Sequence, residues 1–273
     1  MESTSIHLAI PSYNNESGVK RVLERATKQT FASITVLDDG STDKTFKIVA
    51  DFPGVKYIRT EENSGSVAAK NLILRDLPED GWLLYIDSDM EIVSDNIPEK
   101  LSDFVARHPK VGAGVGLIRR DGEPMRFLRG YDLNPVRMIL AAVFYTLHQA
   151  LPKNSSIQLF VRKLAHPFTM DFHPIEESMI DWAVEGFSFY KIDLFRQYNG
   201  FDSAFIRNHE GPDLCLKLRK AGHQVWFFPG IELRDNDQHC HSNWWRRYQW
   251  WRSTLIYFVK HPSRLFVWGR PLP

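Results

Sequence analysis

Five consecutive apolar residues at positions 82–86 are followed directly by Asp87, Ser88 and Asp89. A short, uninterrupted apolar run is typical of a strand buried on both faces, as in a parallel sheet that helices cover. Open α/β sheets bind their ligands at the carboxyl ends of such strands. This segment therefore predicts an α/β fold with polar, ligand-binding chemistry at one edge of the central sheet.

The first half of the chain repeats this pattern, since short apolar runs alternate with segments of helical periodicity. We expect strands at residues 6–10, 34–37, 55–58 and 111–118 and helices at residues 18–30, 66–74 and 99–107, with a further helix opened by Ser41 and Thr42. After a poorly periodic region at 119–181, we expect strands at 184–190 and 225–228 and helices at 193–198 and 212–221. The alternation favours one largely parallel α/β sheet.

The chain has 273 residues, 43% of them apolar and 25% charged, which is enough for a core without disulfides or structural metals. Cys215 and Cys240 are too few for a disulfide framework, and no signal-like segment opens the chain, so we expect a cytoplasmic setting. The longest mostly apolar stretch, residues 136–151, contains Arg137 and His148, so we expect no helix that spans a bilayer.

The net charge of +1 excludes a globally basic nucleic-acid-binding protein, and nucleic acid is not an expected partner. Residues 241–273 contain six Lys or Arg and no Asp or Glu, which leaves a net charge of −5 on residues 1–240. This basic tail also has one helical face of apolar and aromatic residues, at steps of four and three: Trp244, Tyr248, Trp251, Leu255 and Phe258. Such a face either packs on the core or lies at an anionic membrane surface, and both interpretations stay open.

Asp87 and Asp89 are two residues apart on an extended strand end, so their side chains point to the same side. Carboxylate oxygens in this arrangement can hold Mg²⁺ or Mn²⁺. The spacing alone is not specific, because Asp235 and Asp237 repeat it. The position after a buried strand favours the first pair as the metal site.

Asp38 and Asp39 end the second expected strand, and Gly40, Ser41 and Thr42 lead into a helix. Hydroxyl side chains at this place favour the N-cap of a helix. Capping does not account for two successive aspartates, and a carboxylate at a strand end can accept hydrogen bonds from a ribose or a base N–H. We therefore expect this pair to help bind a nucleotide.

Three ordered segments resemble the nucleotide-sugar-binding half of family 2 glycosyltransferases of the A-type fold: IPSYNNESGVKRVLERATKQTFASITVLDDGSTDKT, NSGSVAAKN and LLYIDSDMEI. The resemblance implies a Rossmann-like, largely parallel central sheet flanked by helices, in one domain over residues 1–240. It also implies that residues 1–120 bind the donor and that residues 182–240 carry the acceptor and catalytic side. Residues 241–273 would form a separate basic, aromatic helix or tail.

The resemblance assigns roles to matching residues of this chain. The expected donor-binding residues are Pro11, Tyr13, Asp38, Asp39, Asn63, Gly65, Lys70, Asp87 and Ser88. Asp87 and Asp89 are expected to bind the divalent metal, Mg²⁺ or Mn²⁺, that bridges the donor diphosphate. The family more often has Arg at the position of Lys70, and Lys keeps the charge but loses the bidentate geometry.

WAVEGFSFYKIDLFRQYNGFD resembles the acceptor side of the family, and HEGPDLCLKLRKAGHQVWFFP resembles its catalytic region, which usually reads Glu-Asp-x-Asp-Leu with the general base after Glu. This chain has Gly211 at that place, so the base is expected to be Glu210 or Asp213. Pro212 suits the first turn of the helix, which would leave Glu210 in the preceding loop and Asp213 inside the first turn. A carboxylate in the first turn is often engaged in capping, so we favour Glu210.

His239 and His241 follow this helix and lie close to the acids Asp235 and Asp237. In many such transferases a histidine beyond the base helix supplies a further ligand to the donor metal. The resemblance offers His239 or His241 for that role, although the spacing differs from that of the family. The alternative is a polar loop.

Together these features predict a metal-dependent enzyme that transfers a sugar, with inversion, from a nucleotide donor to a hydroxyl acceptor, with a UDP-sugar favoured. The expected acceptor is a glycan, a lipid-linked compound or a small hydroxyl compound, and the tail favours an acceptor presented at the inner face of a membrane. A sugar nucleotidyltransferase is one alternative, but it needs a glycine- and lysine-rich loop that residues 11–18 lack. A sugar-nucleotide- or glycan-binding module without catalysis is the other, suggested by Gly211.

Overall fold

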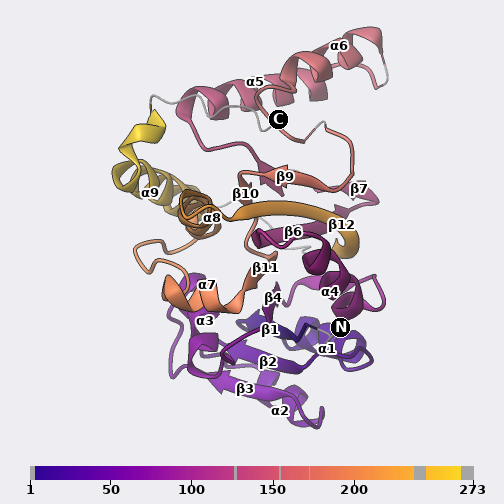
Figure 1. Cartoon of the computed structure of the whole chain (residues 1–273), viewed down its shortest axis with the longest axis vertical. Helices are drawn as coiled ribbons and strands as arrows, with labels where there is room; N and C mark the ends of the chain where they lie inside the picture. The colour runs from indigo at the N-terminus through magenta and orange to yellow at the C-terminus, as the bar shows by residue number, and fades with distance from the viewer. Residues whose placement is uncertain (1–3, 126–127, 154, 172, 237–243, 266–273) are drawn as a thin grey trace.

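The computed structural model describes residues 4–125, 128–153, 155–171, 173–236 and 244–265. A twisted central sheet runs through the molecule, with helices packed on both of its faces (Figure 1). The strands of this sheet follow the order β3-β2-β1-β4-β11-β6-β12-β5. The protein therefore has the α/β architecture that its sequence predicts.

The first half of the sheet is parallel, as the alternation of strands and helices predicts. Its strands are β3 (Lys56–Arg59), β2 (Ser33–Asp38), β1 (Ile6–Ser12) and β4 (Trp82–Ile86). The accompanying helices are α1 (Glu16–Ala26), α2 (Thr45–Ala50), α3 (Ser66–Asn71) with its 3₁₀ extension η1 (Leu72–Arg75), and α4 (Ile97–Arg107). Because β1, β2 and β4 are parallel, their carboxyl ends meet at one edge of the sheet.

The second half of the sheet is mixed. β11 (Phe187–Lys191) lies antiparallel between β4 and β6 (Val111–Arg120), and β12 (Gln224–Asp235) runs parallel to β6. The chain enters β11 at the carboxyl edge of β4, where the amide of Asp87 donates to the carbonyl of Gly186 at 2.9 Å, so β11 has to run back along β4. The shorter strands are β5 (Met90–Ile92), β7 (Glu123–Pro124) and β9 (Ser178–Ile180), with β8 (Arg129–Gly130) and β10 (Trp182–Ala183) in a separate two-stranded sheet.

Glycines in β6 make room for the aromatic rings of β11. A Cβ at Gly114 would overlap the ring of Phe189, and a Cβ at Gly116 would overlap the ring of Phe187. Both rings are fully buried. The glycine spacing of β6 is therefore a packing requirement of this strand pair.

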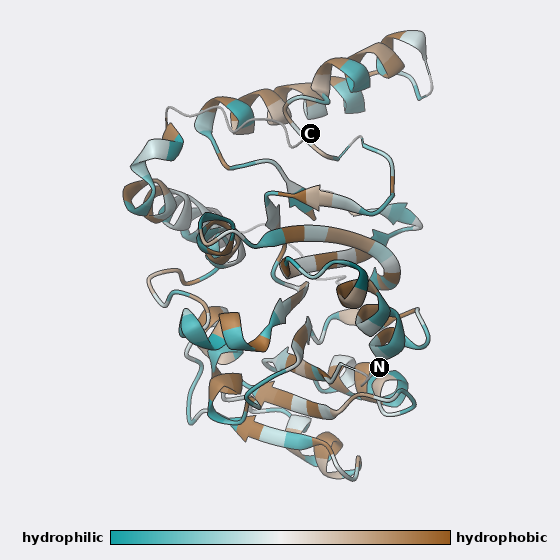
Figure 2. Cartoon of the chain, viewed as in Figure 1, coloured by the Kyte–Doolittle hydropathy of each residue, from teal (hydrophilic) through white to brown (hydrophobic). Residues whose placement is uncertain are grey.

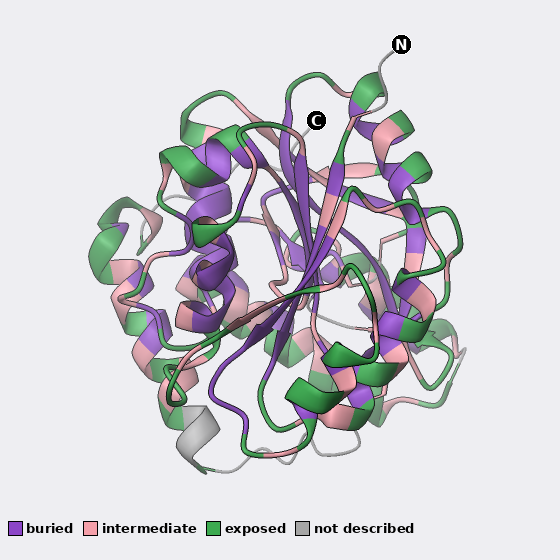
Figure 3. Ribbon diagram, turned by 90° about the horizontal axis from the view of Figure 1, so that it is seen from below, coloured by how far each residue is buried: buried purple, intermediate pink, exposed green. Residues whose placement is uncertain are grey.

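The core consists of two apolar clusters, one on each face of the sheet. The first includes buried residues of α1 and α4, and the second includes buried residues of α3, α7 (Ile192–Gln197) and α8 (Glu210–Lys220). Figure 3 shows the buried strands at the centre and the exposed outer faces of the surrounding helices.

Two helices, α5 (Pro135–Ala150) and α6 (Ser156–Ala165), lie at the end of the molecule opposite β3 (Figure 1). α5 corresponds to the amphipathic stretch at residues 136–151, and Asn134 caps it by accepting hydrogen bonds from the amides of its first turn. α6 lies in the region where the sequence shows the least periodicity, and no helix is predicted there.

The last described elements are α9 (Trp244–Lys260) and the 3₁₀ segment η2 (Pro262–Leu265). α9 is fastened to the domain by Ser253, whose hydroxyl donates to the carbonyl of Arg207 at 2.7 Å. Within the described ranges, no helix is long and apolar enough to cross a bilayer.

Candidate active site

A pocket of about 400 Å³ opens at the carboxyl edge of β1, β2 and β4. Its lining residues come from these strand ends, from α3 and the loop before it, and from the second half of the chain: Pro11, Ser12, Tyr13, Asn15, Asp39, Asn63, Gly65, Ser66, Ala69, Asp87, Ser88, Asp89, Ile206, Arg207 and Gln249. Of the expected donor-binding residues, Asp38 and Lys70 do not line it. The other expected donor-binding residues meet in this one pocket, which we call the donor pocket.

A tight turn after β4 holds Asp87, Ser88 and Asp89 at the donor pocket. The amide of Ser88 donates to the carbonyl of Pro11 at 3.3 Å, which joins the turn to the end of β1. The side chain of Asn15 donates to the hydroxyl of Ser88 at 3.1 Å. These bonds fix the backbone from which both aspartates project.

Asp87 and Asp89 fit a divalent cation. Asp87 Oδ1 is buried without a hydrogen-bond partner among the described residues, and the ammonium of Lys70 lies 3.7 Å away. Hard carboxylate oxygens are the ligands that Mg²⁺ and Mn²⁺ prefer. In the described part of the chain, no group of three or more His, Cys, Asp or Glu could hold a metal ion by itself. Further ligands would have to come from outside this set, such as diphosphate oxygens or water.

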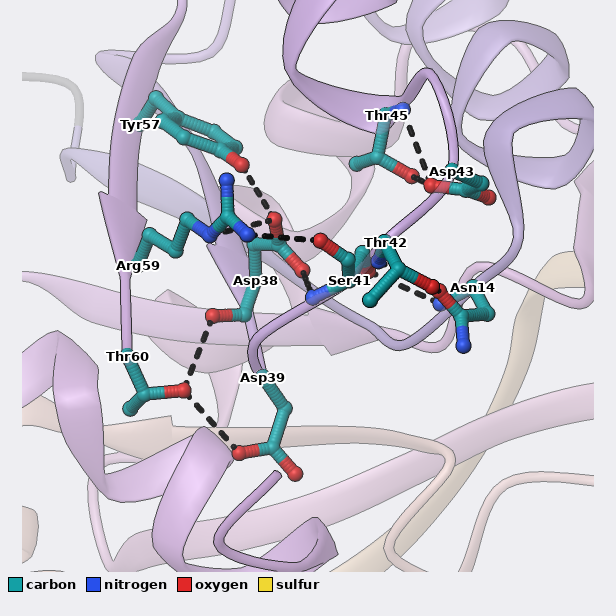
Figure 4. Close-up of polar contacts among 10 residues, drawn as sticks. All are labelled: Asn14, Asp38, Asp39, Ser41, Thr42, Asp43, Thr45, Tyr57, Arg59 and Thr60. Atoms are coloured by element: carbon teal, nitrogen blue, oxygen red, sulfur yellow. Dashed lines mark hydrogen bonds and ion pairs between the residues drawn. The ribbon is translucent and has the colours of Figure 1, made fainter. Parts of the chain in front are cut away.

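Asp39 is buried at the end of β2 and fastens the loop before α3. Its Oδ1 accepts hydrogen bonds from the amide and hydroxyl of Ser64 at 2.7 and 2.6 Å, and its Oδ2 accepts from the amide of Gly65 at 2.9 Å. The hydroxyl of Thr60 donates to the same carboxylate at 3.3 Å (Figure 4). Asp39 therefore positions the loop that carries Asn63 to the donor pocket.

Asp38 is fully buried and points away from the donor pocket, so its position does not support the expected role in donor binding. It accepts hydrogen bonds from the amide of Ser41, at 2.9 Å, and from the phenol of Tyr57, and the Nε of Arg59 lies 3.8 Å away (Figure 4). Burial raises the pKa of Tyr57 above its ordinary value, and the hydrogen bond to Asp38 raises it further. The carboxylate of Asp38 thus holds the turn after β2 to β3.

Lys70 is buried on α3 beside the donor pocket. Its Nζ donates to the carbonyl of Glu185 at 3.3 Å. Burial alone would lower the pKa of Lys70, but the carboxylates around it, Asp87 before Glu210 and Glu185, raise that pKa above its ordinary value. Lys70 is therefore a single buried cation that interacts with several carboxylates.

The position predicted for Glu210 is wrong, because α8 begins at Glu210 and not after it. His209 precedes the helix with a left-handed backbone, φ 69°, and this conformation starts the helix before Pro212. Glu210 is buried, and its Oε2 has no hydrogen-bond partner among the described residues. Burial, together with the charge of Glu185, raises the pKa of Glu210 to about 8, although Lys70 acts in the opposite direction.

Asp213 lies in the first turn of α8, as predicted, but its side chain faces the segment that follows α9. Its Oδ2 lies 2.6 Å from Lys217 Nζ, and its Oδ1 lies 2.7 Å from His261 Nε2. Asp213 is fully buried and does not line the donor pocket. Its carboxylate joins α8 to the segment after α9.

The sequence analysis missed Glu185, which lies between β10 and β11. Its Oε1 accepts a hydrogen bond from the amide of Gly211 at 3.1 Å. A Cβ at Gly211 would lie 2.9 Å both from the carbonyl of Ala183 and from Cγ of Glu185, so this backbone approach requires glycine. The available signal was the same as for Asp87, a carboxylate that follows a short apolar run.

The lining residues of the donor pocket that the sequence analysis did not predict include Asn15, Arg207 and Gln249. Asn15 is the N-cap of α1, and its side chain accepts from the amide of Gly18. Arg207 and Gln249 come from the loop before α8 and from α9. No local pattern predicts that these distant segments reach the edge of the parallel strands.

The second candidate metal cluster receives no support within the described residues. Asp235 is buried and paired with Arg120, whose Nε donates to its Oδ2 at 3.0 Å. Asp237, His239 and His241 lie outside the described residues. The role of either histidine as a metal ligand stays a prediction.

The sequence profile described as glycosyl transferase family 2 matches residues 8–169. This match covers more than half of the chain and includes Asp39 and the pair Asp87 and Asp89. The chain belongs to glycosyltransferase family 2. The sequence motifs therefore predicted the family correctly.

Two curated relatives illustrate the sequence likeness. Over 178 residues, the chain is 28% identical to the poly(ribitol-phosphate) beta-N-acetylglucosaminyltransferase TarS of Staphylococcus aureus. This aligned region covers 56% of this chain and 31% of TarS. Over 109 residues, the chain is 29% identical to an uncharacterized glycosyltransferase of Haemophilus influenzae. This aligned region covers 39% of this chain and 36% of that protein. The chain thus spans about a third of the length of these relatives.

Solved structures establish the fold. The mannosyltransferase PcManGT of Pyrobaculum calidifontis, in complex with GDP-Man and Mn²⁺, superposes with a TM-score of 0.61 at 15% identity over 96% of this chain and 65% of that chain. Residues 1–349 of TarS superpose with a TM-score of 0.59 at 16% identity, over 94% of this chain and 65% of that chain. The same TarS fragment in complex with UDP-GlcNAc superposes with a TM-score of 0.53 at 18% identity, over 84% of this chain and 58% of that chain. The family 2 glycosyltransferase therefore has the predicted A-type fold.

Proposed function

We propose that this family 2 glycosyltransferase moves a sugar from a nucleotide sugar, with a UDP-sugar favoured, to a hydroxyl acceptor, with inversion and with the help of a divalent metal. The observation that carries the proposal is the donor pocket, where polar residues from the ends of three parallel strands meet. TarS was solved with UDP-GlcNAc and the mannosyltransferase with GDP-Man and Mn²⁺, which supports a nucleotide-sugar donor.

The nucleoside part of the donor would lie against β1 and β2. Tyr13 is 49% exposed at the pocket, so its ring is accessible for stacking on a base. Asp39 holds the loop with Asn63 and Gly65 in place for the ribose and phosphates. In this arrangement Asp39 acts mainly through the loop, since its two oxygens already accept four hydrogen bonds.

Asp87 and Asp89 would hold the metal, Mg²⁺ or Mn²⁺, at the end of β4. A bound divalent cation supplies charge stabilisation for the departing diphosphate. Lys70 balances the negative charge of Asp87 from the other side, at 3.7 Å. Ser88 keeps both aspartates in register through its bonds to Pro11 and Asn15.

Inverting transfer requires a carboxylate that takes the proton of the acceptor hydroxyl, on the face of the sugar opposite the diphosphate. Glu185 and Glu210 both lie close enough to Lys70 to raise its pKa. Asp213 is held by Lys217 and His261 instead. The proton acceptor is therefore assigned to the pair Glu185 and Glu210.

Exposed apolar side chains suggest an acceptor at a membrane surface. On α9, Trp244, Trp251, Leu255 and Val259 are 74%, 65%, 66% and 72% exposed, so most of the predicted stripe does not pack on the core. α5 and α6 carry further exposed apolar residues, and Figure 2 shows hydrophobic segments along both helices. These residues are Val136, Ile139, Val143, Leu147, Ile157, Leu159, Phe160 and Leu164.

The positive charge of the tail contributes less than the sequence implies. Lys260 Nζ lies 2.5 Å from Asp202, and Arg264 Nη1 lies 2.6 Å from Asp132, so two of the six cations are compensated within the domain. We therefore assign membrane attachment mainly to the apolar faces, with anionic headgroups adding to it.

The function is tested by the release of UDP or GDP from a panel of UDP-sugars and GDP-mannose in the presence of Mn²⁺. We expect at least one donor to be turned over, and EDTA to abolish the reaction. Asp89→Ala should lower turnover at least 100-fold while the unfolding temperature of the metal-free protein changes little, because Asp89 lines the donor pocket. Full activity in excess EDTA would contradict the proposed metal dependence. If no donor were turned over, the proposed glycosyltransferase function would be wrong.

A further inference from the structure

A second pocket, of about 450 Å³, lies between α5, the start of α8 and α9. Its walls are mainly apolar and aromatic, and include Tyr131, Met138, Phe168, Trp182, Val184 and Trp250. Polar residues also line it: Glu185, His209, Arg129, Asp132, Arg137, Thr169 and Asn208.

Glu185 lies where this second pocket adjoins the donor pocket. A Cβ at the next residue, Gly186, would lie 3.0 Å from Asp87 Oδ2, so the backbone passes directly against the expected metal ligand. Lys70 Nζ donates to the carbonyl of Glu185 at 3.3 Å and lies 3.7 Å from Asp87 Oδ1. One short segment thus connects the metal end of the donor pocket to the wall of the second pocket.

Glu210 and Asp213, the two carboxylates expected to act as the base, line neither of these two pockets. Glu210 is buried, and Asp213 is held in ion pairs. Glu185, by contrast, is half-buried and fills the space beside Gly211, where a Cβ would lie 3.1 Å from its Oε1. At the start of α8, the carboxylate that reaches a pocket is therefore that of Glu185.

His209 lines the second pocket and has a buried nitrogen without a hydrogen-bond partner among the described residues. The hydroxyl of Thr254 donates to the carbonyl of Trp250 at 2.8 Å, so its oxygen accepts the Nε2–H of His209 at 3.3 Å. Nδ1 of His209 is then a lone-pair acceptor, and it is buried without a partner among the described residues. Burial lowers the pKa of His209 to about 4, so the ring is neutral near pH 7 and Nδ1 stays unprotonated.

We infer that the second pocket binds the acceptor and that Glu185 takes up its proton, an inference that rests on the proposed function. The acceptor oxygen bonds to the anomeric carbon while its proton passes to the carboxylate of Glu185. The bond between the anomeric carbon and the diphosphate oxygen breaks, and its electron pair leaves with the nucleoside diphosphate. The apolar walls fit an acceptor with an apolar group near the reacting hydroxyl.

Glu185→Gln tests the catalytic role. Gln keeps the shape and an oxygen for the Gly211 amide, but it cannot take a proton at neutral pH. UDP release should fall by about 10²–10⁴-fold, with the affinity for UDP and Mn²⁺ unchanged. Glu185→Ala should be equally slow, and sodium formate should restore part of its rate. Glu24→Gln on exposed α1 is the matched control and should behave as the wild type.

Three results would overturn this assignment. Turnover of Glu185→Gln within about threefold of the wild type would show that another group takes the proton, while the donor chemistry remains intact. Loss of activity in Glu185→Ala that formate does not restore would give Glu185 a structural role. A wild-type enzyme that turns over no sugar nucleotide would refute the proposed function, and this inference with it.

The acceptor pocket is tested with octyl β-D-glucoside below its critical micelle concentration, followed by tryptophan fluorescence, since Trp182 and Trp250 line the pocket. We expect saturable binding that Ala142→Phe weakens at least tenfold, because Ala142 lines the pocket on α5. Ala150→Phe, at the exposed end of the same helix, should bind as the wild type does. No saturable binding, or equal binding by both variants, would contradict an apolar acceptor site.

Discussion

Carboxylates outnumber cations around Lys70. Asp87, Glu210, Glu185 and Asp89 all act on this one buried ammonium and raise its pKa. Such an excess of negative charge favours either a bound cation or a proton on one of the carboxylates. The proton is placed on Glu210, because burial raises its pKa to about 8 and its Oε2 has no hydrogen-bond partner among the described residues.

Glu210→Gln should therefore stabilise the metal-free protein at alkaline pH. The folded pKa of about 8 exceeds the ordinary value of 4.5, so the folded state binds more protons than the unfolded state between these values. The favourable contribution of protonated Glu210 is complete below about pH 4.5 and is lost as pH rises through 8. Gln lacks this dependence, and we expect its advantage in free energy of unfolding to grow to about 1–3 kcal/mol at pH 9.

Urea unfolding of both proteins in EDTA, at pH 5 and pH 9, measures this difference. Glu24→Gln serves as the exposed control and should show no change in pH dependence. A Glu210→Gln variant that loses more stability at pH 9 than at pH 5 would mean that the buried carboxylate is ionised and paired.

At the level of single residues, the sequence predicted which residues line the donor pocket better than it predicted the contacts that these residues make. The end of β4 identified Asp87 and Asp89, because a buried strand that stops in carboxylates marks a sheet edge. The separate roles of Asp38 and Asp39 depend on partners 19 to 26 residues away, which no local pattern encodes. The early start of α8 depends on a left-handed His209, which the usual capping residues do not signal.

At the scale of elements, the helices of the second half differ from those of the first in what they cover. α1 and α4 bury one face against the sheet. α9 buries Ser253, Thr254 and Tyr257 but exposes Trp251 and Leu255, so its apolar and aromatic surface exceeds what the domain can cover. Such uncovered apolar area marks an interaction surface.

Trp251→Glu should weaken binding to vesicles of phosphatidylcholine and phosphatidylglycerol, because a 65% exposed ring on α9 becomes a charge. We expect the cosedimenting fraction to fall at least threefold, and added salt to reduce wild-type binding without abolishing it. Phe46→Glu is the matched control, since Phe46 is 58% exposed on α2, at the other end of the molecule (Figure 1). If the wild-type protein did not bind these vesicles at low ionic strength, the proposed membrane-binding surface would be wrong.

The periodic elements were predictable, and the remaining ones were not. β4 was predicted to the residue, and α4 and β6 within two residues at each end, because strong apolar periodicity defines them. α6 was missed because most of its apolar residues face solvent and give no buried stripe. The antiparallel direction of β11 was also missed, because strand direction follows from where the chain re-enters the sheet.

For the whole molecule, the two halves of the sheet meet at β4 and β11, and the donor pocket and the second pocket lie in different halves. The parallel half supplies the donor pocket. Segments after residue 128 supply the walls of the second pocket, and Glu185 lies where the two pockets adjoin. This arrangement would bring donor and acceptor together at the junction of the two halves.

The central claim is that the donor pocket binds a nucleoside diphosphate together with a metal held by Asp87 and Asp89, and a calorimetric titration of UDP tests it most directly. We expect UDP to bind with Mn²⁺ and to bind at least tenfold more weakly in EDTA. Asp87→Asn should remove this dependence on Mn²⁺, whereas Asp51→Asn, at an exposed position after α2, should keep it. UDP that binds equally well with and without Mn²⁺, or to wild type and Asp87→Asn alike, would contradict the account.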